Sequence, residues 1–210
     1  MTPVDNKSLP KDIDRIKMLL LLLYAPGAGN KAHEPVRGRT RLQKQAFLVQ
    51  QELKKLGART LYSFRPYRLG PMSYEIYNDL DWLKFEGTIT EIPQLLSNGE
   101  QYSSFALTEQ GVKEVKKFLQ GERWAELLER VTSIKQGTNS VNLSYLVESV
   151  HEAYPEYMLK ASLVRLLDSF SASTGIAPTK VTAASSPRRL SAKTSVSEEI
   201  RAIRSRDQDN

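Results

Sequence analysis

The segment from Tyr62 to Gly111 constrains the fold of this chain more than any other stretch of its sequence. Apolar residues recur at helical spacing from Met72 to Leu83, and Gly87 is suited to end that helix because glycine accepts a left-handed C-cap conformation. Two runs rich in β-branched and aromatic residues follow, and the Asn98-Gly99 pair between them favours a hairpin. An alternating run from Tyr62 to Tyr67 predicts one further strand before the helix.

The order of these elements is typical of winged helix-turn-helix domains. Gly70-Pro71 marks a turn, Ser73 can cap the helix that follows it, and Thr108 can cap the helix after the hairpin. A helix that ends at Glu86-Gly87, then a hairpin and a new helix, completes the pattern. The sequence therefore predicts a mainly α-helical protein with a small β-hairpin, in a winged helix-turn-helix-like domain with a C-terminal helical extension.

Two helices are predicted upstream of this segment. The first, Lys11 to Tyr24, is apolar almost all round and is expected to be buried on more than one face. A polar loop from Gly27 to Arg37 follows it. The second helix begins at Thr40, which fits a capping box with Gln43, and it carries an apolar stripe at helical spacing. The stripe residues are Leu42, Ala46, Val49, Leu53 and Leu56, and Gly57 is placed to end the helix.

Further helical patterns follow Thr108 and Gly121, and Asn142 or Ser140 is placed to cap another that ends before Pro155. Leu159 to Phe170 predicts one more amphipathic helix, and Ser197 to Arg206 is a candidate nascent helix. The stretch 171–210 has no aromatic residue and is expected to be disordered, because it cannot bury enough apolar surface to offset chain entropy. The predicted divisions are a flexible N-terminus at 1–10, a winged-helix-like domain at 11–120, a helical extension at 121–170 and a disordered basic tail at 171–210.

Composition excludes several classes of function. None of the 210 residues is a cysteine, which excludes disulfides, thiol catalysis and Cys-ligated zinc, and is compatible with a reducing cytosol. The apolar run from Met18 to Tyr24 is far too short to span a bilayer, and its acidic flank does not fit a signal peptide. We therefore expect a cytoplasmic protein without a membrane partner. The net charge of +6 permits nucleic-acid binding, although such a charge also serves solubility.

Three sequence motifs resemble a known group of bacterial proteins, the YwgA-like and SocA/Panacea group. They are Arg41-Leu42-Gln43-Lys44-x-x-Phe47-Leu48, then Phe64-x-x-Tyr67-x-x-Gly70-Pro71-x-Ser73, and finally the run from Val150 to Tyr157. The resemblance covers roughly Arg37 to Leu166. It implies a small helical domain found in antitoxins, proteolytic adaptors and proteins beside mobile-element or phage-defence genes, with YwgA-like members resembling winged-helix transcription regulators. It implies no enzyme.

Basic residues gather at the predicted start of the second helix and around the Gly-Pro turn. In a winged helix the helix before the recognition helix crosses the DNA backbone, where Arg and Lys can contact phosphates. A solvated basic face is an equally good interpretation. The predicted nucleic-acid contacts are Arg39, Arg41, Lys44, Arg65 and Arg68, together with Ser73 and Asn78 on the recognition helix.

The Met72 to Glu86 helix argues against tight DNA binding. Its polar residues include four acids and one base, and phosphate repels an acidic face. Opposite its core stripe lie three aromatic residues, Tyr74, Trp82 and Phe85, which we predict to be partner-binding. The alternative is that other helices of the chain cover this second face.

No catalytic, cofactor or metal site is predicted. The two histidines, His33 and His151, lie in different segments without a partner at metal-ligand spacing, and His151 fits a partly buried helix position. The first functional hypothesis is a non-enzymatic, DNA-binding winged-helix transcription regulator. The second is a protein-binding adaptor or antitoxin-like component whose partner is a toxin, a protease or a defence component.

Overall fold

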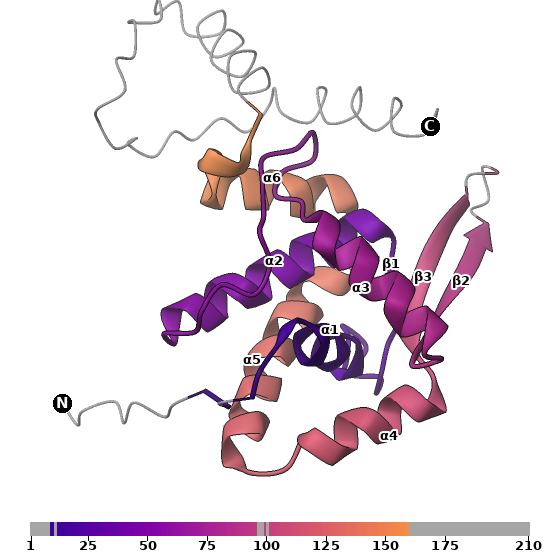
Figure 1. The fold of residues 1–210 in the computed structure, drawn as a ribbon. Coiled ribbons are helices and arrows are strands. Elements are labelled where there is room, and N and C mark those ends of the chain that lie inside the picture. The colour runs from indigo at the N-terminus through magenta and orange to yellow at the C-terminus, as the bar shows by residue number, and fades with distance from the viewer. Residues whose placement is uncertain (1–8, 11, 96–98, 100, 160–210) are drawn as a thin grey trace, which may run out of the picture.

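The computed structural model describes residues 9–10, 12–95, 99 and 101–159 (Figure 1). These residues form six α-helices, one 3-10 helix and three strands. The predictions for residues 1–8, for the helix from Leu159 to Phe170 beyond its first residue, and for the tail at 171–210 lie outside the described residues. The fold is mainly helical with a small antiparallel sheet, as predicted.

Helix α1 (Arg15–Tyr24) lies at the centre of the molecule, with α2, α4 and α5 packed around it (Figure 1). It begins where the Asp14 side chain accepts a hydrogen bond from the Lys17 backbone N–H. All six residues from Met18 to Leu23 are buried, so the prediction of burial on more than one face is confirmed. Within the described part of the chain, no helix has both the length and the apolar character needed to cross a membrane.

Helix α2 (Arg39–Lys55) crosses the core and is buried along most of its length. The predicted stripe from Leu42 to Leu53 is fully buried, and Gly57 adopts a positive φ of 82° just after the helix. The predicted capping box is wrong. The helix begins after Gly38, so Thr40 lies inside the first turn and Gln43 is directed to another partner.

The sheet has the order β1–β3–β2, with all neighbours antiparallel. Strand β1 (Val36–Arg37) lies in the segment predicted as a polar loop, and it pairs with the middle of β3 (Gln101–Leu107). Strand β2 (Ile89–Leu95) pairs with β3 along its whole length, which confirms the predicted hairpin. Helix α4 (Glu109–Phe118) follows, and the Thr108 side chain caps it by accepting from the Gly111 N–H.

Helix α3 (Tyr74–Phe85) lies between the long connection from α2 and the hairpin (Figure 1). The strand predicted from Tyr62 to Tyr67 does not form. Instead, an isolated antiparallel bridge joins Arg65 to Met72, and an isolated parallel bridge joins Tyr67 to Met158, which follows α6 (Leu143–Ala153). The Gln50 side chain of α2 bonds the backbone N–H and carbonyl of Tyr62, where a neighbouring strand would otherwise supply the partners.

The C-terminal helices belong to the same packed body. Helix α5 (Glu122–Asn139) adds Trp124, Leu127 and Val131 to the core cluster formed by α1, α2 and α3. Helix α6 (Leu143–Ala153) begins at Asn142, whose side chain accepts from the Ser144 N–H, and it packs on α2. A 3-10 turn, η1 (Pro155–Tyr157), follows it.

Candidate functional site

Polar side chains on the buried face of α2 hold the connection between α2 and α3. The Gln43 amide donates to the Ser73 carbonyl at 2.8 Å and accepts from the Ser73 N–H at 3.0 Å. Seven residues later on the same helix, Gln50 makes the equivalent pair of bonds with Tyr62, at 2.9 and 2.7 Å. Between them, the Lys44 ammonium donates to the Pro71 carbonyl at 2.9 Å. These side chains pair backbone groups that burial would otherwise leave unsatisfied.

A second network fixes the rotation of α3. The buried Tyr62 hydroxyl donates to the Asp79 carboxylate at 2.8 Å, and Arg15 pairs with Asp79 and Glu75 at 3.2 and 3.1 Å. Burial raises the pKa of Asp79, while the Tyr62 hydrogen bond and the Arg15 charge oppose that rise. Asp79 therefore points into the protein, so the helix surface is less acidic than its sequence indicates. Ser73 is buried as well, and its hydroxyl donates to Glu75.

With α3 held in this rotation, its two faces meet different surroundings. Ile76, Leu80 and Leu83 enter the core. The opposite face is open: the exposed fractions are 48% for Tyr74, 49% for Trp82 and 87% for Phe85, and Asn78 is exposed between them. We call the set Tyr74, Asn78, Trp82 and Phe85 the α3 face. The alternative, in which other helices cover this face, is wrong for the helices that the structure describes.

Two of the predicted phosphate contacts are buried, so that prediction is wrong for them. Arg41 donates to the carbonyls of Thr138 and Val141 at the end of α5, and Lys44 donates to Pro71. Each charged group is paired with backbone carbonyls where it is buried, as burial of a charge requires. Their positive charges are not presented on the surface of α2.

The remaining predicted contacts are spread over the loop and helix starts. Arg39 is half-exposed, but its guanidinium pairs with Glu91 at 2.9 Å and lies 5.6 Å from the centre of the Tyr77 ring. Arg65 is exposed and lies over the Tyr74 ring at 4.7 Å. Arg68 is half-buried. Of the seven predicted nucleic-acid contacts, Arg65 and Asn78 are the two exposed residues that adjoin or belong to the α3 face.

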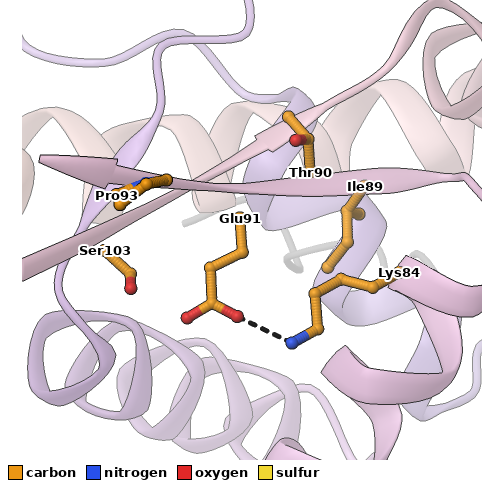
Figure 2. A pocket seen from close by; sticks show the side chains of 6 residues that line it. All are labelled: Lys84, Ile89, Thr90, Glu91, Pro93 and Ser103. Carbon is orange, nitrogen blue, oxygen red and sulfur yellow. Dashed lines mark hydrogen bonds and ion pairs between the residues drawn. The ribbon is translucent and has the colours of Figure 1, made fainter.

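An open cleft of about 510 Å³ separates the C-terminal half of α3 from β2 and β3 (Figure 2). Figure 2 shows Glu91 directed from β2 toward Lys84 of α3, and their charged groups lie 2.7 Å apart. Burial raises the pKa of Glu91, but hydrogen bonds from Lys84, Arg39 and Ser103 outweigh it and lower the pKa to about 2. The carboxylate therefore stays charged and ties α2, α3 and the hairpin together.

A second buried cluster lies at the Gly-Pro turn. Burial lowers the pKa of Lys44 to about 7. Burial, with a smaller contribution from the Lys44 charge, lowers the pKa of His151 to about 4. The His151 Nε2 atom has no hydrogen-bond partner among the described residues. Gly70 adopts a φ of 88°, and a Cβ atom there would lie 2.9 Å from this nitrogen, so both conformation and space require glycine.

Sequence reasoning missed Gln43, Gln50 and Glu91 as the residues that position α3. The seven-residue spacing of the two glutamines on an otherwise apolar face was an available signal, since it places both on one side of the helix. The Glu91 contacts cross from α2 to a distant hairpin and leave no local pattern. In the part of the chain that the structure describes, no group of three or more potential metal ligands is brought together.

The chain was compared with protein-family models and with curated proteins. No family model matches it, and no curated protein matches it.

Proposed function

We propose that this protein is a non-enzymatic regulatory protein of winged-helix type that binds another protein through its α3 face. The order α1–β1–α2–α3–β2–β3, with β3 in the middle of the sheet, supports the winged-helix framework. In that framework α3 takes the place of the recognition helix and β2–β3 that of the wing. The α2–α3 connection, residues 56–73, is longer than the turn of about three to four residues in a simple helix-turn-helix.

The exposure of the α3 face is the observation that carries the proposal. Three large aromatic side chains at helix positions i, i+8 and i+11 lie on one side of α3, Phe85 exposed and Tyr74 and Trp82 half-exposed, and exposed apolar side chains on one face mark interaction sites. Aromatic residues are also the common anchors of protein interfaces. Nearby cations are already engaged: Lys84 pairs with Asp81 and Glu91, and Arg39 pairs with Glu91. A face of this composition suits an apolar protein surface better than a phosphate backbone.

The sequence resemblance supplies the kind of partner. A toxin, a protease or a component of a phage-defence system is the class of protein that such adaptors and antitoxins bind. The proposal places this encounter in the cytoplasm, where the absence of cysteine is compatible with reducing conditions.

DNA binding is the second candidate function, and one observation favours it. Asn78 is exposed at the middle of α3, beside the position of Arg65 over Tyr74. An asparagine on a recognition helix can read adenine, and an arginine at its start can contact phosphate. With Arg41 and Lys44 buried, we expect this binding to be weak and poorly sequence-specific.

A capture experiment with matched variants tests the protein-binding proposal. Full-length protein is immobilised beside the variants Trp82→Ala and Phe85→Ala, and Tyr145→Ala serves as control because Tyr145 is an exposed aromatic residue on α6. Each bait is incubated with a lysate of the source cells, and retained proteins are quantified by mass spectrometry. The proposal predicts that at least one protein is retained by the wild type and by the Tyr145→Ala control, and is not retained by Trp82→Ala or by Phe85→Ala. Equal retention by all four baits would refute it.

Fluorescence anisotropy with a labelled DNA duplex tests the second candidate. If the protein binds DNA through this end, Arg65→Ala should weaken binding on every sequence and reduce the salt dependence by about one counterion. Affinity that Arg65→Ala and Asn78→Ala leave unchanged would exclude α3 as the DNA-contacting helix.

A further inference from the structure

We propose that a C-terminal segment of this same chain, residues 196–206, binds the α3 face and occupies it until the partner protein displaces it. The regulatory consequence rests on the proposed function, because it presumes a partner for that face. The contact itself does not, since it follows from the shape and charge of the face and from the sequence of the segment. The segment lies outside the described residues, so it is argued from its sequence alone.

The α3 face has a defined length and a charge polarity. From Tyr74 to Phe85 it extends eleven residues, about 17 Å along a helix. Its N-terminal end carries the exposed Arg65 guanidinium over the Tyr74 ring. Its C-terminal end carries the exposed carboxylates of Asp81 and Glu86, of which Asp81 pairs with the Lys84 ammonium at 2.8 Å. The N-terminal end is therefore the more positive and the C-terminal end the more negative, in the same sense as the helix dipole of α3.

Residues 196–206 match this face in length, apolar spacing and charge order. Val196, Ile200 and Ile203 recur at i, i+4 and i+7, which places them on one side of a helix of about 15 Å. Two acids, Glu198 and Glu199, stand at the start of the segment. Three arginines stand at positions 201, 204 and 206. A parallel alignment with α3 brings the acids toward Arg65 and the arginines toward Asp81 and Glu86.

The course of the chain makes this contact reachable. Met158, one residue before the end of the described part, forms a bridge with Tyr67, which lies in the connection that leads into α3. The chain thus leaves the described body beside the N-terminal end of the face. A random coil of 36 residues, the number between the described part and Val196, spans about 30–36 Å, so the chain is long enough to reach along the face. Such tethering gives an effective concentration of about a millimolar, so even a weak contact is populated.

Cysteine cross-linking tests the contact, because the native chain contains no cysteine. Gln110→Cys supplies a thiol at the C-terminal end of α3, where Gln110 is exposed and its amide lies 3.1 Å from the Glu86 carbonyl oxygen. It is combined in the full-length chain with Ser205→Cys, with Ser197→Cys, or with Ser185→Cys as the tether control. All three partners are neutral serines, so every native charge is kept. Disulfide formation is followed by gel electrophoresis at several protein concentrations.

The proposal predicts that the 110/205 pair closes about tenfold faster than the 110/185 control, at a rate independent of protein concentration. The 110/197 pair should close more slowly than 110/205, because the parallel alignment places it at the far end. Adding Ile200→Asp and Ile203→Asp should return the 110/205 rate to the control value, whereas Val181→Asp should not. Equal rates for the three pairs, faster closure of 110/197, or cross-links only between two chains would each overturn the proposal.

The outcome separates this inference from the proposed function. If the 110/205 disulfide forms fast but the capture experiment finds no protein whose retention depends on Trp82, the intramolecular contact stands and the protein-binding proposal is refuted. If a captured protein depends on Trp82 but the 110/205 disulfide forms no faster than the 110/185 control, the protein-binding proposal stands and the intramolecular contact is refuted.

Discussion

Replacing Lys44 with methionine should change how the stability of this protein depends on pH. Burial lowers the pKa of Lys44 from 10.5 to about 7, and its ammonium donates to the Pro71 carbonyl at 2.9 Å. At 1.36 kcal/mol per pKa unit, keeping this charge buried costs about 5 kcal/mol. Methionine removes that cost but leaves the Pro71 carbonyl without its donor, which costs about 1–3 kcal/mol. We therefore expect Lys44→Met to be about 2–4 kcal/mol more stable than wild type near pH 7.

The dependence of the free energy of unfolding on pH tests the burial of Lys44 more sharply than its value at one pH. Between pH 7 and 10 the unfolded chain keeps the proton on Lys44 while the folded protein has lost it, so stability rises with pH by about 1.4 kcal/mol per unit. Lys135, which is buried and donates to the carbonyls of Leu23 and Ala25, adds a similar slope because burial lowers its pKa to about 7 as well. Lys44→Met should therefore remove about half of the wild-type slope.

Urea unfolding followed by circular dichroism at pH 7, 8 and 9 measures this directly. Lys54→Met is the matched control, because Lys54 is an exposed lysine on the same helix. A wild-type stability that is flat over this range, or a slope that Lys44→Met leaves unchanged, would show that the Lys44 ammonium is not buried at the Gly-Pro turn.

Three other predictions concern the residues that hold α3. Gly70→Ala should lower the free energy of unfolding by about 2–4 kcal/mol and Gly57→Ala by only about 1 kcal/mol. Both glycines have a positive φ, but only a Cβ atom at position 70 would meet His151. Equal losses of stability in urea unfolding would contradict this. Gln43→Ala should cost about 1–3 kcal/mol, since it leaves the buried N–H of Ser73 without its acceptor and removes the amide bond to the Ser73 carbonyl. A loss well below about 1 kcal/mol in the same assay would refute that role. Glu91 stabilises the fold at pH values above its ordinary pKa of 4.5, and that contribution is lost as the pH falls toward about 2. Glu91→Gln should therefore lower the stability at pH 7 and weaken the dependence of stability on pH below pH 4.5. An unchanged pH dependence in that range would exclude the Lys84–Glu91–Arg39 contact.

Local signals in the sequence were sufficient for the elements around α3. The core side of α3, the β2–β3 hairpin and the caps at Thr108 and Asn142 all depend on residues close together in the chain, and all are confirmed. The same holds for the aromatic side of α3, whose members repeat at helical spacing.

The polar interior could not be predicted from local pattern. A lysine and two glutamines on α2 are ordinarily exposed, and their burial depends on backbone groups of Tyr62, Pro71 and Ser73 that need partners. Competition between neighbouring signals explains the other errors. Gly38 begins α2 before the Thr40 capping box, and Gln50 bonds replace the ladder of the predicted strand at Tyr62.

The central claim is that the aromatic side of α3 lies outside the core of the described body, and the free energy of unfolding of Trp82→Ala and Phe85→Ala tests it most directly. Phe85 is 87% exposed and Trp82 about half exposed, so Phe85→Ala should lower stability by less than about 1 kcal/mol and Trp82→Ala by less than about 2 kcal/mol in urea unfolding. Trp124→Ala, at a buried position, is the contrasting variant and should cost about 3–5 kcal/mol. Losses of that size at Trp82 or Phe85 would show that the face is core, and would contradict both the proposed function and the docking of the C-terminal segment.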